Sequence, residues 1–428
     1  MSADGTTRAH RTVEAVWRIE SPGLIAALSR MVRDVGAAEE LAQDALVAAL
    51  EQWPGSGVPD NPGAWLMAIA RRRAVDLLRR RTTLDRKHAE MGRLLDAEQI
   101  TEDDFDAALD EDARIDDDLL RLMFVACHPV LPVDARVALT LRLLGGLSTD
   151  EIARAFLVAE ATVAQRIVRA KRTLAAARVP FEVPSGAERA ERVASVLAVI
   201  YLVYNEGYSA TTGDDWVRPA LCDEAVRLGR VLAELLPDEA EVHGLVALME
   251  LQSSRLRARV GPHGEPVLLL DQDRRRWDRL LIRRGLAGLG RAESLGGTLG
   301  PYALQAAIAA CHARARTADE TDWERIVALY DALSQLMPSP VVDLNRAVAI
   351  SMAFGPAAGL AAVELLQDEP ALRSYHLLPS VRGDLLLKLG YRDAARVEFE
   401  RAAALTRNQR ERALLLSRAA SCAASPAG

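Results

Sequence analysis

The chain has 428 residues and a formal net charge of −7 at pH 7; half of its residues are hydrophobic and 26% are charged. These proportions are typical of a folded globular protein and exclude a disordered chain. The acidic total argues against a protein that coats nucleic acid, and no apolar run reaches the roughly 18 residues of a membrane span. Aromatic residues are only 4%, while Ala and Leu, the strongest helix formers, are abundant. We therefore predict an all-α protein.

Residues 10–82 predict a small helical bundle. Apolar spacing indicates a helix over 13–32, interrupted near Pro22, and a second helix over 37–53. A Pro- and Gly-rich loop at 54–62 precedes a third helix over 63–81, which turns Trp65, Leu66, Ile69, Val75 and Leu78 inward and a row of Arg outward. With Trp53 just before the loop, this arrangement is suited to single-stranded DNA through phosphate neutralisation and base stacking. The alternative is a merely solvated basic helix.

Residues 83–118 hold 14 Asp or Glu against four Arg or Lys. Such charge density predicts an extended acidic linker that does not collapse. Its carboxylates either imitate RNA in a basic channel of a partner or form a solvated tether.

Residues 119–178 predict a helix-turn-helix. A helix from Asp134 ends at Gly145-Gly146, and Ser148 with Glu151 forms a capping box for the next, short helix. The following helix, 160–176, buries Val163, Ile167 and Ala170. Its outward side chains are Arg, Gln and Thr, and Arg and Gln can pair bidentately with guanine and adenine edges. A solvated basic helix is again the alternative. The outward residues are Thr162, Gln165, Arg166, Arg169 and Arg172.

Prolines at 180 and 184 break the chain before a long helical block, 185–428. Weak repeats of tetratricopeptide type run through this block, as at Gly383, Ala395 and Phe399. The segment Asn205–Tyr208 either ends a helix or contacts a ligand.

Chemistry-bearing residues give no catalytic pattern. The four cysteines are scattered, which indicates a reducing cytoplasm, and the polar first residues predict no signal peptide. Cys127-His128 lies in an apolar run and is predicted to be a packed cysteine, not a nucleophile with its base. The histidines lack ligand spacing and no phosphate-binding Gly loop occurs. We therefore expect no enzyme activity, no metal and no cofactor.

Three motifs in order carry a family resemblance. Residues 39–46 (EELAQDAL), 64–80 (AWLMAIARRRAVDLLRR) and 146–153 (GLSTDEIA) with the helix that follows resemble, respectively, the core-binding helix, the −10 helix and domain 4 of extracytoplasmic-function (ECF) sigma factors. The block beginning with 201–208 (YLVYNEGY) resembles the subgroup with a C-terminal tetratricopeptide-like extension. The implied domains are sigma domain 2 (10–82), the linker (83–118), sigma domain 4 (119–178) and a regulatory domain (185–428).

The resemblance implies partners and site residues. The partners would be promoter DNA and bacterial RNA polymerase core, through its β′ clamp helices and β flap, with the C-terminal domain contacting the sigma domains. Core binding would use Glu40, Gln43 and Asp44. The −10 DNA would meet Asn61, in a loop that captures an unpaired base, and Arg71, Arg72, Asp76, Arg79 and Arg80. The −35 major groove would meet Thr162, Gln165, Arg166, Arg169 and Arg172. The sequence departs from the family at Ala164-Gln165, often Lys-Ser, and at Leu157, which replaces the usual turn Gly.

The function predicted is promoter-specific initiation by a dissociable, cytoplasmic polymerase subunit, with a fused regulatory domain that is either required or inhibitory. The alternative is a helix-turn-helix activator with a tetratricopeptide-like sensor domain, which would have no reason to carry residues 37–82. A pure scaffold would not need the basic helix 160–176.

Overall fold

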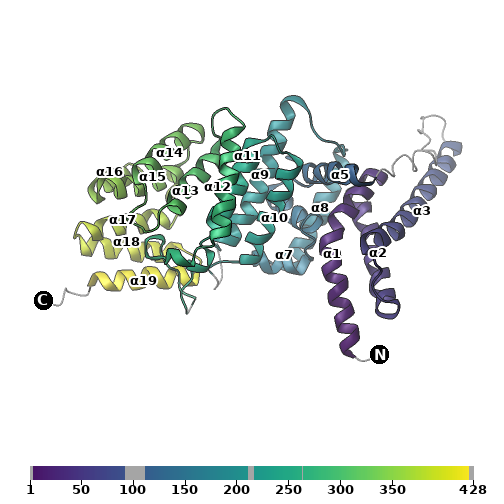
Figure 1. Cartoon of the computed structure of the whole chain (residues 1–428), viewed down its shortest axis with the longest axis horizontal. Coiled ribbons are helices and arrows are strands. Elements are labelled where there is room, and N and C mark those ends of the chain that lie inside the picture. Colours follow the sequence, from purple (N-terminus) through teal and green to yellow (C-terminus); the bar gives the residue numbers. More distant parts are fainter. Residues whose placement is uncertain (1–2, 92–110, 211–215, 263, 424–428) are drawn as a thin grey trace. The chain divides into compact units, whose positions relative to one another are not determined.

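The structure, a computed structural model, describes residues 3–91, 111–210, 216–262 and 264–423, with side chains at 12–80 and from 117 onward within these ranges (Figure 1). Its described residues form α-helices, short 3₁₀ turns and loops, with one isolated antiparallel bridge between Val260 and Pro266 and no strand. The all-α prediction is confirmed. The chain divides into two compact units, Met1–Ile200 and Tyr201–Gly428, and the boundary falls inside one helix.

Unit 1 begins with an amino-terminal bundle of three helices: α1 (Ala3–Val32), α2 (Val35–Ser56) and α3 (Pro62–Met91). The expected interruption at Pro22 is wrong, because α1 runs through it. Proline removes one backbone donor, and burial of Leu24, Ile25 and Leu28 on the next turns offsets that loss. The Asp34 carboxylate caps α2 by accepting from the Ala37 amide at 3.0 Å.

Helix α3 packs through small residues. Leu66, Ala70 and Ala74, spaced four apart on one face, are fully buried, so α3 can lie close to α1 and α2. The predicted inward set is only partly right, because four of its members are half-buried: Trp65, Ile69, Val75 and Leu78.

The second part of unit 1 is the helix-turn-helix bundle: α5 (Glu111–Ala126), α6 (Val133–Leu143), α7 (Thr149–Phe156) and α8 (Glu160–Ala176). Because α3 reaches Met91 and α5 starts at Glu111, the acidic linker is helical at both ends, where we expected an extended chain. Good helix formers occur in both end segments: Arg and Glu in each, and Lys in the first. Its residues 92–110 lie outside the described residues.

Helix α9 (Gly186–Tyr208) belongs to both units. Within unit 1, Arg192 donates to the Phe124 carbonyl at 2.9 Å, and the Ser195 hydroxyl donates to the Cys127 carbonyl at 2.6 Å. Arg136 of α6 donates to Ser195 at 2.9 Å. Residues 186–200 therefore complete the helix-turn-helix bundle, although we expected the C-terminal domain to begin at 185.

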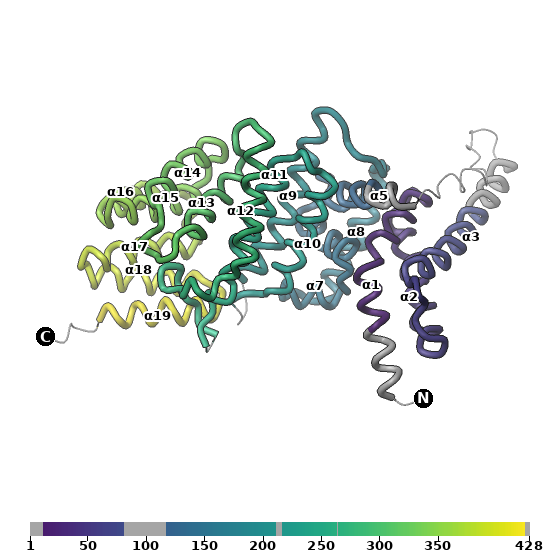
Figure 2. The backbone as a smooth tube through the Cα atoms, in the orientation of Figure 1, coloured from purple at the N-terminus to yellow at the C-terminus, as the bar shows by residue number. Residues whose placement is uncertain are grey.

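Unit 2 continues as consecutive helices, and α17, α18 and α19 lie side by side (Figure 2). Gly383 of α17 shows why small residues recur, since a Cβ there would lie 3.0 Å from Phe399 of α18. This packing agrees with a helical repeat; the tetratricopeptide-like assignment stays a prediction. The helices are α10 (Pro219–Leu235), α11 (Ala240–Ser253), α12 (Arg279–Ser294), α13 (Pro301–Arg314), α14 (Trp323–Leu336), α15 (Pro340–Phe354), α16 (Pro356–Glu364), α17 (Leu377–Lys388), α18 (Arg392–Leu405) and α19 (Gln409–Ala423), with 3₁₀ turns η2 (Leu256–Ala258), η3 (Leu269–Asp271), η4 (Arg274–Arg276) and η5 (Pro370–Leu372).

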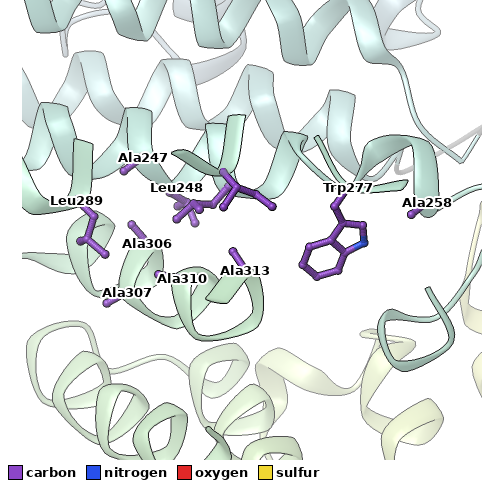
Figure 3. Packing of buried hydrophobic residues seen from close by; sticks show 11 residues of the cluster. Ala247, Leu248, Ala258, Trp277, Leu289, Ala306, Ala307, Ala310 and Ala313 are labelled. Carbon is purple, nitrogen blue, oxygen red and sulfur yellow. The ribbon is translucent and has the colours of Figure 1, made fainter. Parts of the chain in front are cut away.

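The core of unit 2 is built largely from alanine and leucine. One cluster joins α11, α12 and α13, with Trp277 towards one end of it (Figure 3). In that cluster Ala306 and Ala310, on one face of α13, are fully buried. Alanine at such positions lets helices approach closely, so few aromatic residues are needed to fill the space.

Candidate functional site

The turn of the helix-turn-helix has the predicted caps. The Ser148 hydroxyl accepts from the Glu151 amide at 3.1 Å, and the Glu151 carboxylate accepts from the Ser148 amide at 2.8 Å. Burial alone would raise the pKa of Glu151, but the Ser148 hydrogen bonds and the Arg18 charge bring that pKa below its ordinary value. Leu157, which replaces the usual Gly, ends α7 in the left-handed conformation with φ of 50°. The turn geometry is therefore kept at the cost of backbone strain.

Helix α8 presents the predicted outward face. Val163, Ile167 and Ala170 are buried as expected. Arg166 is half-buried and pairs with Asp134 of α6 at 3.1 Å. The other four predicted −35 residues are exposed: Thr162, Gln165, Arg169 and Arg172. The face opposite the core is thus polar, basic and open, as readout of base edges requires.

The predicted −10 residues lie on or next to α3. Asn61 is exposed, and its side-chain oxygen accepts from the Ala64 amide at 3.0 Å, so it also caps this helix. Arg71 is half-buried, and the remaining residues are exposed: Arg72, Asp76, Arg79 and Arg80. The structure therefore brings the predicted −10 set to the surface of one helix and the loop before it.

Trp53 does not fit the stacking role that its position suggested. Its ring is buried, with 2% of the residue exposed, and it meets Trp65 edge-on with centroids 5.4 Å apart. Trp53 is thus part of the core of the amino-terminal bundle, and stacking of a base would fall to the half-buried Trp65.

The predicted core-binding residues occupy the outer side of α2. Glu40 and Asp44 are exposed and Gln43 is half-buried. Asp44 pairs with Arg73 of α3 at 2.7 Å. The Gln43 amide donates to the Glu39 carboxylate at 2.7 Å.

Glu39 is the residue that the motif analysis missed. It is almost fully buried, and its carboxylate accepts from Arg142 of α6 at 2.7 Å and pairs with Lys171 of α8. Burial alone would raise the pKa of Glu39, but the charges and hydrogen bonds of Lys171 and Arg142 bring it below its ordinary value of 4.5. In the sequence, the signal for this role was a carboxylate next to apolar Ala38, Leu41 and Ala42, which the structure buries. Glu39 joins the amino-terminal bundle to α6 and α8.

Further contacts join the two bundles of unit 1. Arg30 of α1 pairs with the buried Asp118 of α5 at 2.7 Å, and Arg18 pairs with Glu151 at 2.7 Å. A cavity of about 640 Å³ lies between the end of α1 and the end of α8. The amino-terminal bundle is therefore packed on the helix-turn-helix bundle through ion pairs.

Cys127 is a packed residue, as predicted. Its thiol is buried and lies 3.3 Å from the Thr140 hydroxyl. Burial raises the pKa of this thiol to about 11, so it is protonated at neutral pH and does not act as a nucleophile.

The described residues show neither a metal-binding cluster nor a membrane-spanning helix. No group of three or more His, Cys, Asp or Glu in the described ranges is placed to hold a metal ion. Within the same ranges, no helix combines the length and apolar character needed to cross a membrane.

Comparison with known proteins agrees with this geometry. Residues 17–83 match the family described as Sigma-70 region 2, and residues 121–174 match Sigma-70, region 4. Residues 192–293 match a family of unknown function, DUF6596. The chain is also 47% identical over 408 residues to an uncharacterised protein of Rhizobium meliloti (strain 1021), covering 95% of both chains. Because both regions are present in order, with their outward faces exposed, the chain belongs to the sigma-70 family of RNA polymerase sigma factors.

Proposed function

We propose that the chain is an ECF-type sigma factor whose C-terminal helical unit, of tetratricopeptide-like type, regulates it. Regions 2 and 4 make it a sigma factor for promoter-specific initiation. In this proposal Glu40, Gln43 and Asp44 contact the β′ clamp helices and region 4 meets the β flap. The −10 and −35 faces described above contact promoter DNA. These partners place the protein in the cytoplasm.

The observation that carries the proposal is the two-sided character of α8. Its apolar stripe is buried against the bundle, while Gln165, Arg169 and Arg172 remain exposed on the opposite side. A purely structural helix gains nothing from such a basic face in an acidic chain, whereas major-groove readout requires it.

Run-off transcription tests the assignment. Full-length protein is added to purified core polymerase without any other sigma factor, on templates selected from a promoter library. A discrete product is expected, because a sigma factor binds core and opens DNA by itself. The activator alternative requires another sigma factor and would give no product; the match of residues 17–83 to region 2 speaks against it.

The regulatory role of unit 2 is tested by removing it. The appropriate truncation ends after Ile200, because residues 186–200 belong to unit 1. We propose a required, positive contribution, so this truncation is expected to lose run-off activity while keeping the helical content of unit 1. A rise in activity would identify autoinhibition instead. Unchanged activity would contradict any regulatory role.

A further inference from the structure

Three arginines lie close together inside unit 2. Arg255 and Arg259 flank η2, and Arg274 begins η4. Arg259 and Arg274 are 7% and 6% exposed, and Arg255 is half-buried. Among the described residues none of the three forms an ion pair with a carboxylate. This is unusual, because buried charges in proteins are normally paired.

The three side chains are held by neutral groups. Arg259 lies over the Tyr208 ring, with its guanidinium carbon 3.6 Å from the ring centroid. Arg274 donates to the carbonyls of His312 and Ala315, at 2.7 and 2.9 Å, and to a threonine hydroxyl. Arg255 lies 5.7 Å from the same Tyr208 ring. Aromatic faces and carbonyls orient these cations but leave their charge uncompensated.

The backbone brings the arginines to one place. The Arg259 amide donates to the Arg255 carbonyl at 3.1 Å, and the Asp278 amide, just beyond η4, donates to the Ser254 carbonyl at 2.7 Å. Trp277, Ala258 and Ala313 beside them belong to one buried apolar cluster (Figure 3). The three arginines therefore lie beside the same buried apolar cluster, close to His312 of α13.

Several buried polar atoms at this place have no hydrogen-bond partner in the part of the chain that the structure describes. They are Arg255 Nε, Gln272 Oε1, Trp277 Nε1 and His312 Nδ1. His312 and Gln272 are each more than nine-tenths buried. The Gln272 amide donates to Val267, which is itself hydrogen-bonded to the Arg259 carbonyl, so Gln272 belongs to the same group. Buried polar atoms are normally satisfied, and a group of orphans points to a missing ligand.

The electrostatics identify the sign of that ligand. Arginine stays protonated in proteins, so the three like charges persist. Within the described ranges, the carboxylate that acts on Arg274 is that of the exposed Glu320. Burial lowers the pKa of His312 to about 3, and the charges of Arg255 and Arg274 lower it in the same direction. His312 is therefore neutral and adds no charge. An anion would relieve the repulsion and supply acceptors for the guanidinium groups.

We propose that unit 2 binds a small anionic molecule through a carboxylate or phosphate group at Arg255, Arg259 and Arg274, beside Tyr208 and His312. Guanidinium groups match both anions in geometry and bind them bidentately. A compact ligand is required because two of the arginines are more than nine-tenths buried. Arg255 is the point of entry, since it alone of the three keeps solvent exposure. Tyr208 is the last residue of α9, so the segment Asn205–Tyr208 ends a helix, as one of the two alternatives predicted. In this proposal Tyr208 also contacts the ligand. The site does not depend on the sigma-factor function.

Thermal unfolding of the full-length protein tests the site. Sodium phosphate and sodium malonate are titrated separately against sodium chloride at equal ionic strength. A saturable rise of Tm beyond that in chloride is expected with at least one anion. A response to phosphate alone identifies a phosphate group, and a response to malonate alone identifies a carboxylate. No saturable rise with either anion would overturn the proposal.

Matched variants locate the site. Arg255→Gln should raise the half-saturating anion concentration at least tenfold, and it should fold because no ion pair is lost. Arg275→Gln is the control, since Arg275 lies on the same turn but is exposed and paired with Asp273. Equal responses of the two variants would refute the site. Independently of any variant, anion binding should move the His312 imidazole NMR signals of the wild type, and saturable binding that leaves them unmoved would place the anion elsewhere.

Discussion

Glu39→Gln tests whether a single buried carboxylate holds regions 2 and 4 together. The side chain keeps its shape but loses its charge, so Arg142 and Lys171 are left facing a neutral amide. Removing one partner of a fully buried pair costs about 3–5 kcal/mol. Here the two cations retain about a fifth of their side-chain exposure, 21% and 20%, and water recovers part of the loss. We expect a cost of about 2–3 kcal/mol, which shifts the equilibrium towards separated regions about 30- to 150-fold.

The shift matters because, while regions 2 and 4 are packed together, their DNA-reading positions are too close to reach both promoter elements. About 25 base steps between the −35 and −10 elements span ~85 Å of straight duplex. From Glu39 the chain reaches Asn61 through about 26 Å of helix and at most ~17 Å of loop, and Lys171 lies about 9 Å along α8 from Gln165. With the Glu39–Lys171 contact included, the two DNA-reading positions are at most about 65 Å apart. We therefore expect this contact to open when both elements are bound.

Distance measurements between labels are the assay. All four native cysteines are buried, so cysteines introduced at Val47 of α2 and Ala176 of α8, both exposed, can be labelled selectively. Glu39→Gln should lengthen and broaden the distance distribution. The matched control is Glu40→Gln, one residue along and exposed, which should leave it unchanged. Identical distance distributions for wild type and Glu39→Gln, with the same midpoint of urea unfolding, would refute the role of Glu39 in holding regions 2 and 4 together.

The same contact has a defined pH dependence. Because the pKa of Glu39 is lowered in the folded protein, its contribution is fully present above the pKa of the unfolded chain. The contribution is lost only as the pH falls through the lowered folded value, below the ordinary range near 4.5. The labels should therefore stay close from neutral pH down to about 5. Acidification within the physiological range is not expected to break the contact of Glu39 with Arg142 and Lys171.

Three further substitutions address region 2, region 4 and the turn. Arg166→Ala should lower promoter affinity by about 1–3 kcal/mol in fluorescence anisotropy. An equal loss of affinity on scrambled DNA would show that Arg166 contacts only phosphate. The control is Asp134→Ala, which frees Arg166 from its ion pair and should not weaken binding. Asp44→Arg should reduce holoenzyme formation in a pull-down without changing helical content, because its exposed pair with Arg73 is worth under about 1 kcal/mol; undiminished holoenzyme would remove Asp44 from the interface. Leu157→Gly should stabilise unit 1 by about 0.5–1 kcal/mol in urea unfolding, since relief of the left-handed strain exceeds the added chain entropy; destabilisation would show that the half-exposed side chain matters more.

Local patterns were sufficient for the helices of region 4. The capping box at Ser148 and the stripe of Val163 and Ile167 depend on spacings of three and four residues, which a sequence shows directly. Partners distant in sequence were not predictable. Glu39 is satisfied by Arg142 and Lys171, more than 100 residues away, and Trp53 is buried because another helix covers it. The prediction of an extended linker was wrong at both ends, where α3 continues to Met91 and α5 begins at Glu111. Helix propensity outweighs charge repulsion in these two segments.

The position of the unit boundary changes how the C-terminal extension must be interpreted. A cut at Pro180, where the proline break suggests a domain border, would remove Arg192 and Ser195 and leave the carbonyls of Phe124 and Cys127 without their donors. Each lost hydrogen bond costs about 0.5–1.5 kcal/mol, and the two together are a noticeable fraction of the stability of a small bundle. Loss of transcription after that cut would follow from a damaged region 4 whether or not unit 2 regulates anything. A cut after Ile200 keeps these contacts. If unit 1 folds normally after that cut and transcription is still lost, the loss of transcription is due to the absence of unit 2 itself.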